Sequence, residues 1–545
     1  MSDHVKCNLH WYPSKPQILA FGCFAFQHVA SLPKALTLMN IATSIERSAL
    51  YLPDRPAVAV DGKETNYRQL NENAAKVASA LVGLGICPGD RVALCAPNSL
   101  EWITFYFGVI KAGAVAVTLS NQLTAAEFTL AVADARAKCI FTTDERIDEI
   151  IPLQGVDMLE KIVAPRGDLS FEQLCAQGDG DFEAVDRDRK DTAAILFTGG
   201  TTGTPKGVML SHENITTAIY NVVFNERSTE KDRALCFLPF NHVFAQMHIM
   251  NATMLSGGCI EMIPAFDLEK VLKITAAGKV TKLFGVPTVY VRLLSVENLR
   301  ERLGAVNYCF SAAASLAVEL VRKWKQRTGL DIHEAYGMTE SASMVTYNHY
   351  YQHVIGSVGT PVGTTEIRIC DANGQPVTRG GEGEIYIRGR NIMTGYLNHP
   401  EETRAAFRGD WFRSGDIGRL DENGHLFLVD RLKDLIITGG ENVYPREIEE
   451  VLFTLPQVQE CSVIGLPDSE WGERVTAIIV PAPGCTVNPG ELKDALKRVL
   501  SPYKVPKEFR IVNELPKTNT GKILKRKIKK DIQLTRHRTG RPADP

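Results

Sequence analysis

The chain has 545 residues, 44% of them hydrophobic, and its 61 lysines and arginines nearly balance its 63 aspartates and glutamates. That length exceeds what a single hydrophobic core accommodates, so we expect a globular protein of two or more domains. The formal net charge of −2 provides no overall field for a nucleic acid or an anionic membrane surface. The expected partners are therefore small molecules, with no nucleic acid among them.

Cysteine usage and the N-terminal sequence indicate a cytoplasmic protein. The twelve cysteines are scattered, without a Cys-x-x-Cys pair or a Cys/His cluster at zinc spacing, and we expect them to be reduced and mostly buried. The apolar stretch 18–30 contains Gln27 and His28 and is shorter than the about 20 helical residues that cross a bilayer. We therefore expect no integral membrane span, and we interpret residues 1–36 as an accessory N-terminal arm.

Helical and strand-like patterns alternate along the first half of the chain. Apolar residues at helical spacing predict helices over 71–84 and 99–111, and short apolar runs predict buried strands over 91–95, 114–117 and 193–197. Such alternation is typical of largely parallel sheets with covering helices.

A different kind of strand is predicted in two segments of the second half. Residues 382–388 and 424–429 are predicted to be antiparallel strands of a β-barrel. A charged link at 430–433 then leads to a short α+β segment that ends near residue 530. The sequence therefore predicts a large N-terminal part and a small C-terminal part.

A loop rich in glycine and threonine follows the strand predicted at 193–197. In Thr198–Gly207 (TGGTTGTPKG), glycines let backbone N–H groups turn toward a phosphate, threonine hydroxyls add donors, and Lys206 adds a positive charge. The Walker A spacing is absent, because Gly207 follows Lys206 where that motif has serine or threonine. Taken alone, the loop predicts either a phosphate cradle or an ordinary Gly/Thr-rich turn.

Five later segments accompany this loop. They are Glu334–Glu340 (EAYGMTE), Arg413–Gly418 (RSGDIG), Asp430–Asp434 (DRLKD), Gly439–Pro445 (GGENVYP) and Pro516–Lys522 (PKTNTGK). In this order and spacing they resemble the motifs of the acyl-adenylate-forming (AMP-binding) superfamily, and within it the fatty acyl-CoA synthetases and acid:CoA ligases. The resemblance covers most of residues 40–530.

The resemblance implies an α/β fold. Its large N-terminal domain would contain two helix-flanked, mostly parallel sheets plus a β-barrel, and its C-terminal domain would be small, mobile and α+β. The implied boundaries are an arm at 1–36, a domain with the acid and ATP sites at 37–430, a hinge at 431–434 and a small domain at 435–545.

The resemblance also implies a two-step reaction that uses ATP, Mg²⁺ and CoA. ATP would convert a carboxylic acid into an acyl-adenylate, and CoA would then take the acyl group as a thioester. Lys522 would bind the carboxylate and α-phosphate oxygens as charge develops in the first step. The catalytic residues would be Lys522, Lys206, Thr339, Glu340 and His242.

In the ATP site, the loop threonines and Lys206 would hold the β- and γ-phosphates, and Thr339 would contact the α-phosphate. Tyr336 would stack on adenine, and Asp416 and Arg431 would fix the ribose hydroxyls. The residues implied in ATP or AMP binding are Thr198, Gly199, Gly200, Thr201, Thr202, Gly203, Thr204, Lys206, Ala312, Ala313, Ala314, Glu334, Ala335, Tyr336, Gly337, Thr339, Asp416, Arg431 and Lys522.

The remaining sites follow from the same resemblance. Glu340 and Thr202 would hold Mg²⁺, a hard cation that prefers oxygen ligands, and Lys433 would be the hinge residue. CoA would pass Gly439, Gly440 and Glu441. The acyl pocket would be lined by His242, Phe244, Met247, Phe284, Gly285, Ser311 and Met338. No arginine or lysine stands among these, which argues against a dicarboxylic acid.

Three departures from the family pattern bear on substrate and rate. Ser311–Ser315 (SAAAS) replaces a commoner Ser-Gly-Gly-Ala-Pro, so added methyl groups would narrow the channel. Asn241 stands where an aromatic residue often precedes the histidine, and Gly199 replaces a serine of the phosphate loop.

Single residues also have simpler interpretations. Lys522 begins the basic run Lys522–Lys530, and lysines in such a run usually form a solvated helix face. We keep that interpretation for Lys525 to Lys530. Outside the motifs, Asp416 would be an ordinary turn residue and Glu340 a surface residue.

These observations predict an AMP-forming acid:CoA ligase that acts on an apolar monocarboxylic acid, a medium- or long-chain fatty acid in the first instance. An aryl acid such as a benzoate, cinnamate or arylacetate is the alternative substrate. An adenylating enzyme that loads a carrier protein is the alternative activity. A homodimer is compatible with the resemblance.

Overall fold

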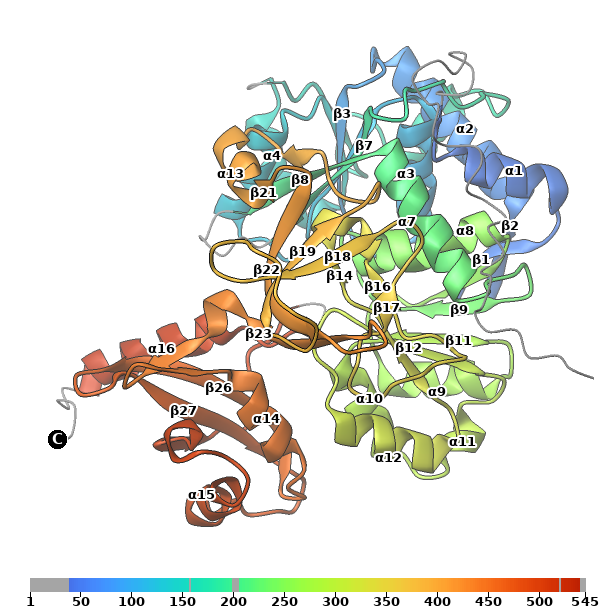
Figure 1. The fold of residues 1–545 in the computed structure, drawn as a ribbon. Helices are drawn as coiled ribbons and strands as arrows, with labels where there is room; N and C mark the ends of the chain where they lie inside the picture. The colour runs from blue at the N-terminus through green and yellow to red at the C-terminus, as the bar shows by residue number, and fades with distance from the viewer. Residues whose placement is uncertain (1–38, 156–157, 199–204, 519–520, 540–545) are drawn as a thin grey trace, which may run out of the picture. The chain divides into compact units, whose positions relative to one another are not determined.

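The computed structural model describes residues 39–155, 158–198, 205–518 and 521–539 (Figure 1). The predicted arm at 1–36 lies outside these ranges. The ten cysteines within them are free thiols. None of the helices in these ranges is both long enough and apolar enough to cross a membrane.

The first large sheet has seven strands in the order β20-β8-β7-β4-β3-β5-β6. The strands from β7 to β6 pair in parallel, and β8 and β20 are antiparallel additions. Its strands are β3 (Arg91–Cys95), β4 (Val115–Thr118), β5 (Cys139–Thr142), β6 (Lys161–Val163), β7 (Thr192–Thr198), β8 (Lys206–Ser211) and β20 (Gly395–Tyr396). The helices between them are α3 (Leu100–Lys111), α4 (Ala125–Ala135), α5 (Asp144–Ile150), η3 (Ile151–Leu153) and α6 (Phe171–Gln177).

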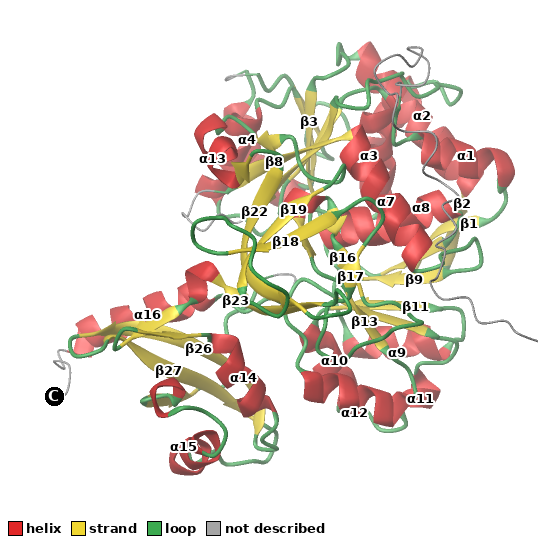
Figure 2. Ribbon diagram, in the orientation of Figure 1, coloured by secondary structure: helices red, strands yellow, loops and turns green. Residues whose placement is uncertain are grey.

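The second large sheet also has seven strands, in the order β13-β12-β11-β9-β10-β1-β2, and all but the edge strand β2 are parallel. Its strands are β1 (Pro56–Val60), β2 (Lys63–Asn66), β9 (Arg233–Cys236), β10 (Cys259–Met262), β11 (Lys282–Gly285), β12 (Tyr308–Ser311) and β13 (Ile332–Glu334). The helices around it are α1 (Thr43–Tyr51), α2 (Tyr67–Gly83), α7 (His212–Asn225), η4 (Phe244–Asn251), α8 (Ala252–Ser256), α9 (Leu268–Ala276), α10 (Pro287–Leu294), α11 (Leu299–Arg302) and α12 (Val318–Thr328). Figure 2 shows α9 to α12 beside the β11, β12 and β13 end of this sheet.

An antiparallel sheet of five strands follows where the barrel was predicted. Its strands are β18 (Glu366–Cys370), β19 (Gly383–Arg388), β21 (Phe407–Arg408), β22 (Trp411–Leu420) and β23 (Leu426–Arg431). Short elements nearby are β14 (Gly337–Met338), η5 (Thr339–Ser341), β15 (Ser343–Met344), β16 (Thr346–Tyr347), β17 (Thr360–Pro361) and α13 (Pro400–Ala406).

A separate sheet forms the C-terminal part, with β24 (Ile436–Thr438), β25 (Glu441–Val443), β26 (Val458–Asp468), β27 (Gly472–Pro481) and β28 (Glu508–Ile511). The helical segments of this part are η6 (Leu432–Asp434), α14 (Pro445–Phe453), α15 (Pro489–Lys497), η7 (Pro502–Lys504) and α16 (Lys525–Thr539). Alternate residues of β26 face opposite sides: Val463 packs with α14 and α15, and Ile464 packs with α16. This sheet is therefore covered by helices on both faces.

The predicted fold class is confirmed, with largely parallel sheets and covering helices followed by a separate C-terminal sheet. The strand predicted at 91–95 matches β3, and the helix predicted at 99–111 is α3 with Ser99 as its N-cap. The helix predicted at 71–84 begins earlier, at Tyr67, because Asn66 and Gln69 form a capping box there. The start of this helix was therefore set by polar residues outside the apolar pattern.

Candidate active site

Three predicted nucleotide-binding residues meet at one carboxylate. In the β22–β23 register, Asp416 is the partner of Arg431, and Arg431 Nε lies 3.2 Å from Asp416 Oδ1. The hydroxyl of Tyr336 donates a 2.7 Å hydrogen bond to Asp416 Oδ2. Asp416 is buried, and each of its two carboxylate oxygens contacts a residue that the family resemblance assigns to the adenine or ribose site.

Glu334 lies at the end of β13, next to Ala335 and Tyr336. Burial raises the pKa of its carboxyl to about 8, and the nearby Arg446 guanidinium opposes this shift. Its Oε2 has no hydrogen-bond partner within the ranges that the structure describes. Glu334 therefore presents a protonated carboxyl at neutral pH beside the predicted adenine site.

The alanines that replace the common glycines follow β12 directly. Ala313 has a φ of 69°, in the left-handed region that glycine adopts without penalty. Ala312 and Ala314 flank it. The backbone here keeps the conformation of a glycine turn although the sequence carries methyl groups, so this turn is strained.

The phosphate end of the site is partly described. Gly199, Gly200, Thr201, Thr202, Gly203 and Thr204 lie outside the described residues, but the two ends of their loop are paired, because Thr198 in β7 is the partner of Lys206 in β8. Lys206 Nζ lies 3.7 Å from Glu402 Oε1 and 5.5 Å from the centre of the Tyr396 ring.

Tyr396 connects Lys206 to the predicted metal ligand. Its hydroxyl donates a 2.9 Å hydrogen bond to Glu340 Oε1. Glu340 directly follows Thr339, which is buried at the start of η5. Lys206, Thr339 and Glu340 are therefore brought to one place, and sequence reasoning missed Tyr396 and Glu402, which lie in no motif.

Lys522 follows a tight turn of the C-terminal part. Gly521 has a φ of 82°, and a Cβ at this position would lie 2.8 Å from Thr288 Oγ1. Burial, followed by the charges of Arg431 and Lys433, lowers the pKa of Lys522 to about 7. The lysine is thus held among the ribose-site and hinge residues.

His242 is influenced by the same lysine. Burial, and then the charge of Lys522, lowers the pKa of His242 to about 4. Its Nδ1 accepts a hydrogen bond of 3.2 Å from the Phe244 amide. The imidazole is therefore neutral near pH 7, at the place where Lys522 and the predicted acyl pocket meet.

A π-helix supplies one wall of the predicted acyl pocket. Phe244 and Met247 lie on η4 (Phe244–Asn251), and both are buried. Ring centres lie 6.4 Å apart between Phe244 and Phe284, and 5.6 Å apart between Phe244 and Phe310. π-Helical turns are frequent at functional sites. Gly285, Ser311 and Met338 are the neighbouring predicted residues on β11, β12 and β14.

Sequence reasoning missed a buried polar group behind these rings. His248 Nε2 lies 2.6 Å from Glu226 Oε1, and His248 Nδ1 lies 3.2 Å from Ser343 Oγ. We call His248, Ser343 and Glu226 the polar floor. The signal for it was weak, because a lone histidine in an apolar run is usually a core residue.

Two further residues hold Glu226 in place. Lys282 Nζ lies 3.2 Å from Glu226 Oε2, and the Tyr308 hydroxyl donates a 3.0 Å hydrogen bond to Glu226 Oε1. Burial opposes ionisation of this carboxyl, but the charges of Lys282 and His248 outweigh it, so the pKa of Glu226 is lowered. Glu226 is therefore a buried carboxylate that is fully paired.

The predicted hinge and CoA residues lie in the C-terminal part. Lys433 is in η6, where burial and the charge of Arg431 lower its pKa. Gly439 and Gly440 have φ values of 60° and 83° in the turn between β24 and β25, and Glu441 begins β25. The turn itself requires both glycines, whichever ligand passes them.

Arg446 of α14 joins the C-terminal part to β23. Its backbone amide donates to Asp430 Oδ2 at 2.9 Å, and its Nη1 donates to the carbonyl of Leu428 at 2.9 Å. The Glu450 carboxylate, 3.5 Å from Arg446 Nε, also accepts from the Val318 amide. These contacts form an interdomain latch, by which we mean Arg446, Glu450 and Asp430.

The interpretation of Lys525 to Lys530 as a solvated face is wrong at its first residue. Lys525 Nζ lies 2.8 Å from Glu449 Oε1, and the charges of Glu449 and Asp430 raise its pKa against the effect of burial. Because α16 packs on β26, its N-terminal lysine is close to acidic groups of α14 and the hinge.

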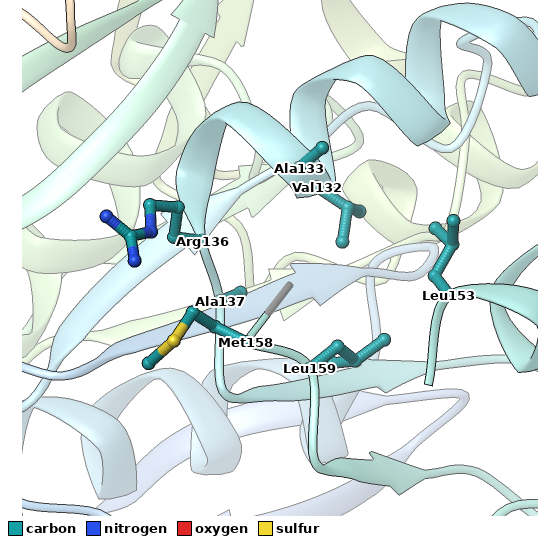
Figure 3. A pocket seen from close by; sticks show the side chains of 7 residues that line it. All are labelled: Val132, Ala133, Arg136, Ala137, Leu153, Met158 and Leu159. Atoms are coloured by element: carbon teal, nitrogen blue, oxygen red, sulfur yellow. The ribbon is translucent and has the colours of Figure 1, made fainter. Parts of the chain in front are cut away.

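Two other features contribute nothing to this site. A small, mostly apolar pocket of about 20 Å³ lies between α4 and the segment around Leu159, away from the motif residues (Figure 3). Within the described ranges, no group of three or more His, Cys, Asp and Glu could hold a metal ion.

Comparison with known proteins gives consistent matches over most of the chain. Family models described as "AMP-binding enzyme" and "AMP-binding enzyme C-terminal domain" match residues 45–397 and 447–522. A feruloyl-CoA synthase of Amycolatopsis is 36% identical over 487 residues, which cover 89% of this chain and 97% of the relative. A long-chain-fatty-acid–CoA ligase of Bacillus subtilis is 33% identical over 547 residues, covering 94% of this chain and 97% of the relative. The crystal structure of an anthranilate CoA ligase in complex with anthranoyl-AMP has a TM-score of 0.87 at 29% identity, covering 93% of this chain and 99% of that one.

Proposed function

The chain belongs to the AMP-binding enzyme family and is an AMP-forming acyl-CoA ligase, and we propose that the acid it activates is an apolar monocarboxylic acid built on an aromatic ring. ATP and CoA are its other substrates. The observation that carries the proposal is the cluster of rings around Phe244, directly behind the neutral His242 and the lysine that acts on it.

In the first step, a carboxylate would attack the α-phosphate and pyrophosphate would leave. Lys522 supplies a positive charge where the reacting oxygens would meet, and the low pKa of His242 keeps a second cation from competing with it. Tyr336, Asp416 and Arg431 would hold adenine and ribose, so that the nucleotide is fixed before the acid arrives.

Glu340 fits a role in holding Mg²⁺. It offers a carboxylate, the ligand type that this cation prefers, and the Tyr396 hydroxyl orients it through Oε1. When bound, the ion would neutralise phosphate charge. Lys206 would add charge from the other side, after exchanging its contact with Glu402 for the phosphates.

The second step requires that Lys522 leave and a thiol enter. We place the hinge at Lys433, two residues after Arg431. A rotation at this hinge would have to break the contacts of the interdomain latch. Gly439, Gly440 and Glu441 would then line the path of the pantetheine arm. Glycine allows close approach of such a ligand.

The shape of the acyl wall supports an aryl acid. Phe244, Phe284 and Phe310 present ring faces and edges to one another at centroid separations typical of aromatic pairs. The ring of an aromatic acid would extend this cluster by packing its own face or edge against these side chains. The feruloyl and anthranoyl groups in the descriptions of two relatives are both aromatic.

A medium- or long-chain fatty acid is the second candidate. The Bacillus subtilis relative acts on long-chain fatty acids, and the buried Met247, Met250 and Met254 would give an alkyl chain an adaptable surface. Such an alkyl chain would have to pass the polar floor, which includes His248.

The test is acid-dependent release of AMP and acyl-CoA from ATP, Mg²⁺ and CoA, with a series of aryl acids and of fatty acids from acetate to stearate. Lys522→Ala serves as the blank. Turnover of aryl acids with one thioester formed per AMP supports the proposal. A preference for one fatty chain length would replace it with the second candidate, and pyrophosphate exchange without thioester would indicate a carrier protein as the acceptor.

A further inference from the structure

The short strand β20 is attached to the strand that carries Lys206. Tyr396 of β20 is the antiparallel partner of Val208 in β8, the strand that begins at Lys206. The next residue, Leu397, donates its amide to the Gly207 carbonyl at 2.7 Å. Main-chain hydrogen bonds therefore fix the position of Tyr396 relative to the start of β8.

The same segment is also attached to Glu340. The Met393 amide donates to the Glu340 carbonyl at 2.8 Å, and the Tyr396 hydroxyl donates to Glu340 Oε1 at 2.9 Å. One of these hydrogen bonds holds the main chain of Glu340, and the other holds its side chain. A carboxylate that is held at two points has less conformational freedom to lose when a ligand binds.

Tyr396 contacts Lys206 and Glu340 with different parts of one side chain. Lys206 Nζ lies 5.5 Å from the centre of the Tyr396 ring, within the range of a cation–π interaction. Burial, and then the charge of Glu340, raises the pKa of Tyr396 above its usual value, so the hydroxyl stays protonated and remains a donor. The ring therefore attracts the ammonium group while the hydroxyl binds the carboxylate.

Tyr396 is itself held by α13. Its amide donates to Thr403 Oγ1 at 2.9 Å, and the Thr403 hydroxyl donates to the His399 carbonyl at 2.8 Å. The same helix carries Glu402, whose Oε1 lies 3.7 Å from Lys206 Nζ and whose side chain is 43% exposed. Such an exposed ion pair contributes little, so approaching phosphates can replace it. The contacts of Tyr396 do not compete with phosphates in this way.

We propose that Tyr396 is a positioning residue for the triphosphate of ATP, since its ring places the ammonium group of Lys206 and its hydroxyl orients the carboxylate of Glu340. The inference rests on the roles proposed for Lys206 and Glu340, and it is independent of which acid is activated. The parts that AMP shares with ATP are predicted to be held by other residues, among them Tyr336 and Asp416. Loss of the Tyr396 hydroxyl should therefore weaken binding of a triphosphate and leave binding of AMP unchanged.

The experiment measures dissociation constants by titration calorimetry, with excess Mg²⁺, for AMP and for α,β-methylene-ATP, an analogue that cannot release pyrophosphate. The proteins are the unmodified chain, Tyr396→Phe, Tyr396→Leu, Glu340→Gln and the control Tyr67→Phe. Tyr396→Phe removes the hydroxyl and keeps the ring, so it tests the proposal even where Tyr396→Leu fails to fold. Tyr67 is a matched control, because it is buried and its hydroxyl donates to the Gly258 carbonyl at 2.7 Å, outside the motifs.

In Tyr396→Phe, we expect the analogue to bind about tenfold more weakly, as when the hydrogen-bond partner of a metal-binding carboxylate is removed, and AMP to bind as before. Tyr396→Leu should weaken the analogue further, because Lys206 also loses the ring beside it. Tyr67→Phe should bind both nucleotides like the unmodified chain. Equal weakening of AMP and the analogue in Tyr396→Phe would indicate a merely structural tyrosine, and that result overturns the inference.

A double variant shows whether the hydroxyl acts through Glu340. We expect Tyr396→Phe combined with Glu340→Gln to bind the analogue no more weakly than Glu340→Gln alone, because residues that act together are not additive. Independent effects that multiply would overturn the inference. Weaker analogue binding in Glu340→Gln but not in Tyr396→Phe would overturn it as well, with the role of Glu340 intact. Unchanged analogue binding in Glu340→Gln would overturn both.

Discussion

Burial, and after it the charge of Lys522, lowers the pKa of His242, although the lysine belongs to the last motif of the chain and the histidine precedes the π-helix of the acyl wall. Gly521, directly before the lysine, lies so close to Thr288 that a Cβ at this position would clash with the threonine hydroxyl. In this arrangement the lysine that we propose to act in adenylate formation already lies near the predicted acid site.

Replacement of Lys522 by alanine should therefore affect one step only. We expect Lys522→Ala to reduce adenylate formation by a factor on the order of 100 or more, as loss of a transition-state charge contact does, and to keep most of the thioester step from supplied acyl-adenylate. Pyrophosphate exchange and single-turnover thioester formation measure the two steps. Lys527→Ala, on an exposed position of α16, is the matched control. Equal loss of both steps would contradict the assignment.

Adenylate formation should depend on pH through the same residue. Only protonated Lys522 carries the charge, and its pKa is lowered to about 7 by burial, Arg431 and Lys433. The kcat/KM for adenylate formation, which reports the free enzyme, should then decrease as pH rises through about 7. In Lys522→Arg the side chain stays charged, so this decrease should disappear even if the rate is lower. A persistent decrease in that variant would assign the effect to another group.

The hydroxyl of Tyr336 should contribute to nucleotide binding. Tyr336→Phe removes its hydrogen bond to the Asp416 carboxylate, a contact worth about 1–2 kcal/mol, so KM for ATP should rise by about five- to thirtyfold with little change in kcat. Steady-state kinetics with varied ATP measures this. Tyr51→Phe, at an exposed position, should leave KM unchanged. An unchanged KM in Tyr336→Phe would show that the carboxylate is held by Arg431 alone.

The interdomain latch should favour the first step. Arg446→Ala removes the bond to the Leu428 carbonyl and the partner of Glu450, so the C-terminal part would spend less time with Lys522 at the acid site. We expect adenylate formation to fall by about three- to tenfold, and the thioester step from supplied acyl-adenylate to stay unchanged or increase. Slowing of both steps to the same extent would mean that Arg446 merely stabilises the fold.

The turn at Ala313 should be more stable with glycine. Ala313→Gly removes the cost of an alanine in the left-handed conformation, about 1–2 kcal/mol. Glycine also gives the unfolded chain more conformational entropy, which offsets part of this gain. The free energy of unfolding should therefore rise by about 0.5–1 kcal/mol. Chemical denaturation measures it. Ala314→Gly, where φ is not positive, should lower stability instead. A loss of stability in both variants would show that the Ala313 methyl contributes packing that outweighs its strain.

Several elements could be predicted from the sequence because local signals agree. The strand Arg91–Cys95 lies between a Pro-Gly turn and a polar segment, and its apolar run can only be buried. Gly521–Lys522 and Asp416–Arg431 could be located because their motifs have fixed spacing. The structure brings Tyr336, Asp416, Arg431 and Lys522 together as the motifs imply.

The polar floor could not be predicted, because its three members come from separate parts of the chain and none lies in a motif of fixed spacing. Glu226 follows α7, His248 lies on η4, and Ser343 follows the strained residue Ala342. Only tertiary packing places them behind Phe244. Lys525 illustrates the same limit, since its ion pair with Glu449 depends on how α16 packs and the composition of its run indicates a solvated face.

The π-helix at Phe244–Asn251 gives the acyl wall an unusual evolutionary freedom. The Ala252 amide donates to the carbonyl of Met247, five residues earlier, so this hydrogen bond encloses one residue more than an α-helical bond does. Deleting a single residue would restore α-helical bonding and rotate every later side chain by about 100° relative to Phe244. His248 would then no longer pack against these rings, whereas His242, which precedes the helix, would keep its position. A deletion of one codon could therefore change the side chains of the acyl wall without moving the predicted catalytic residues.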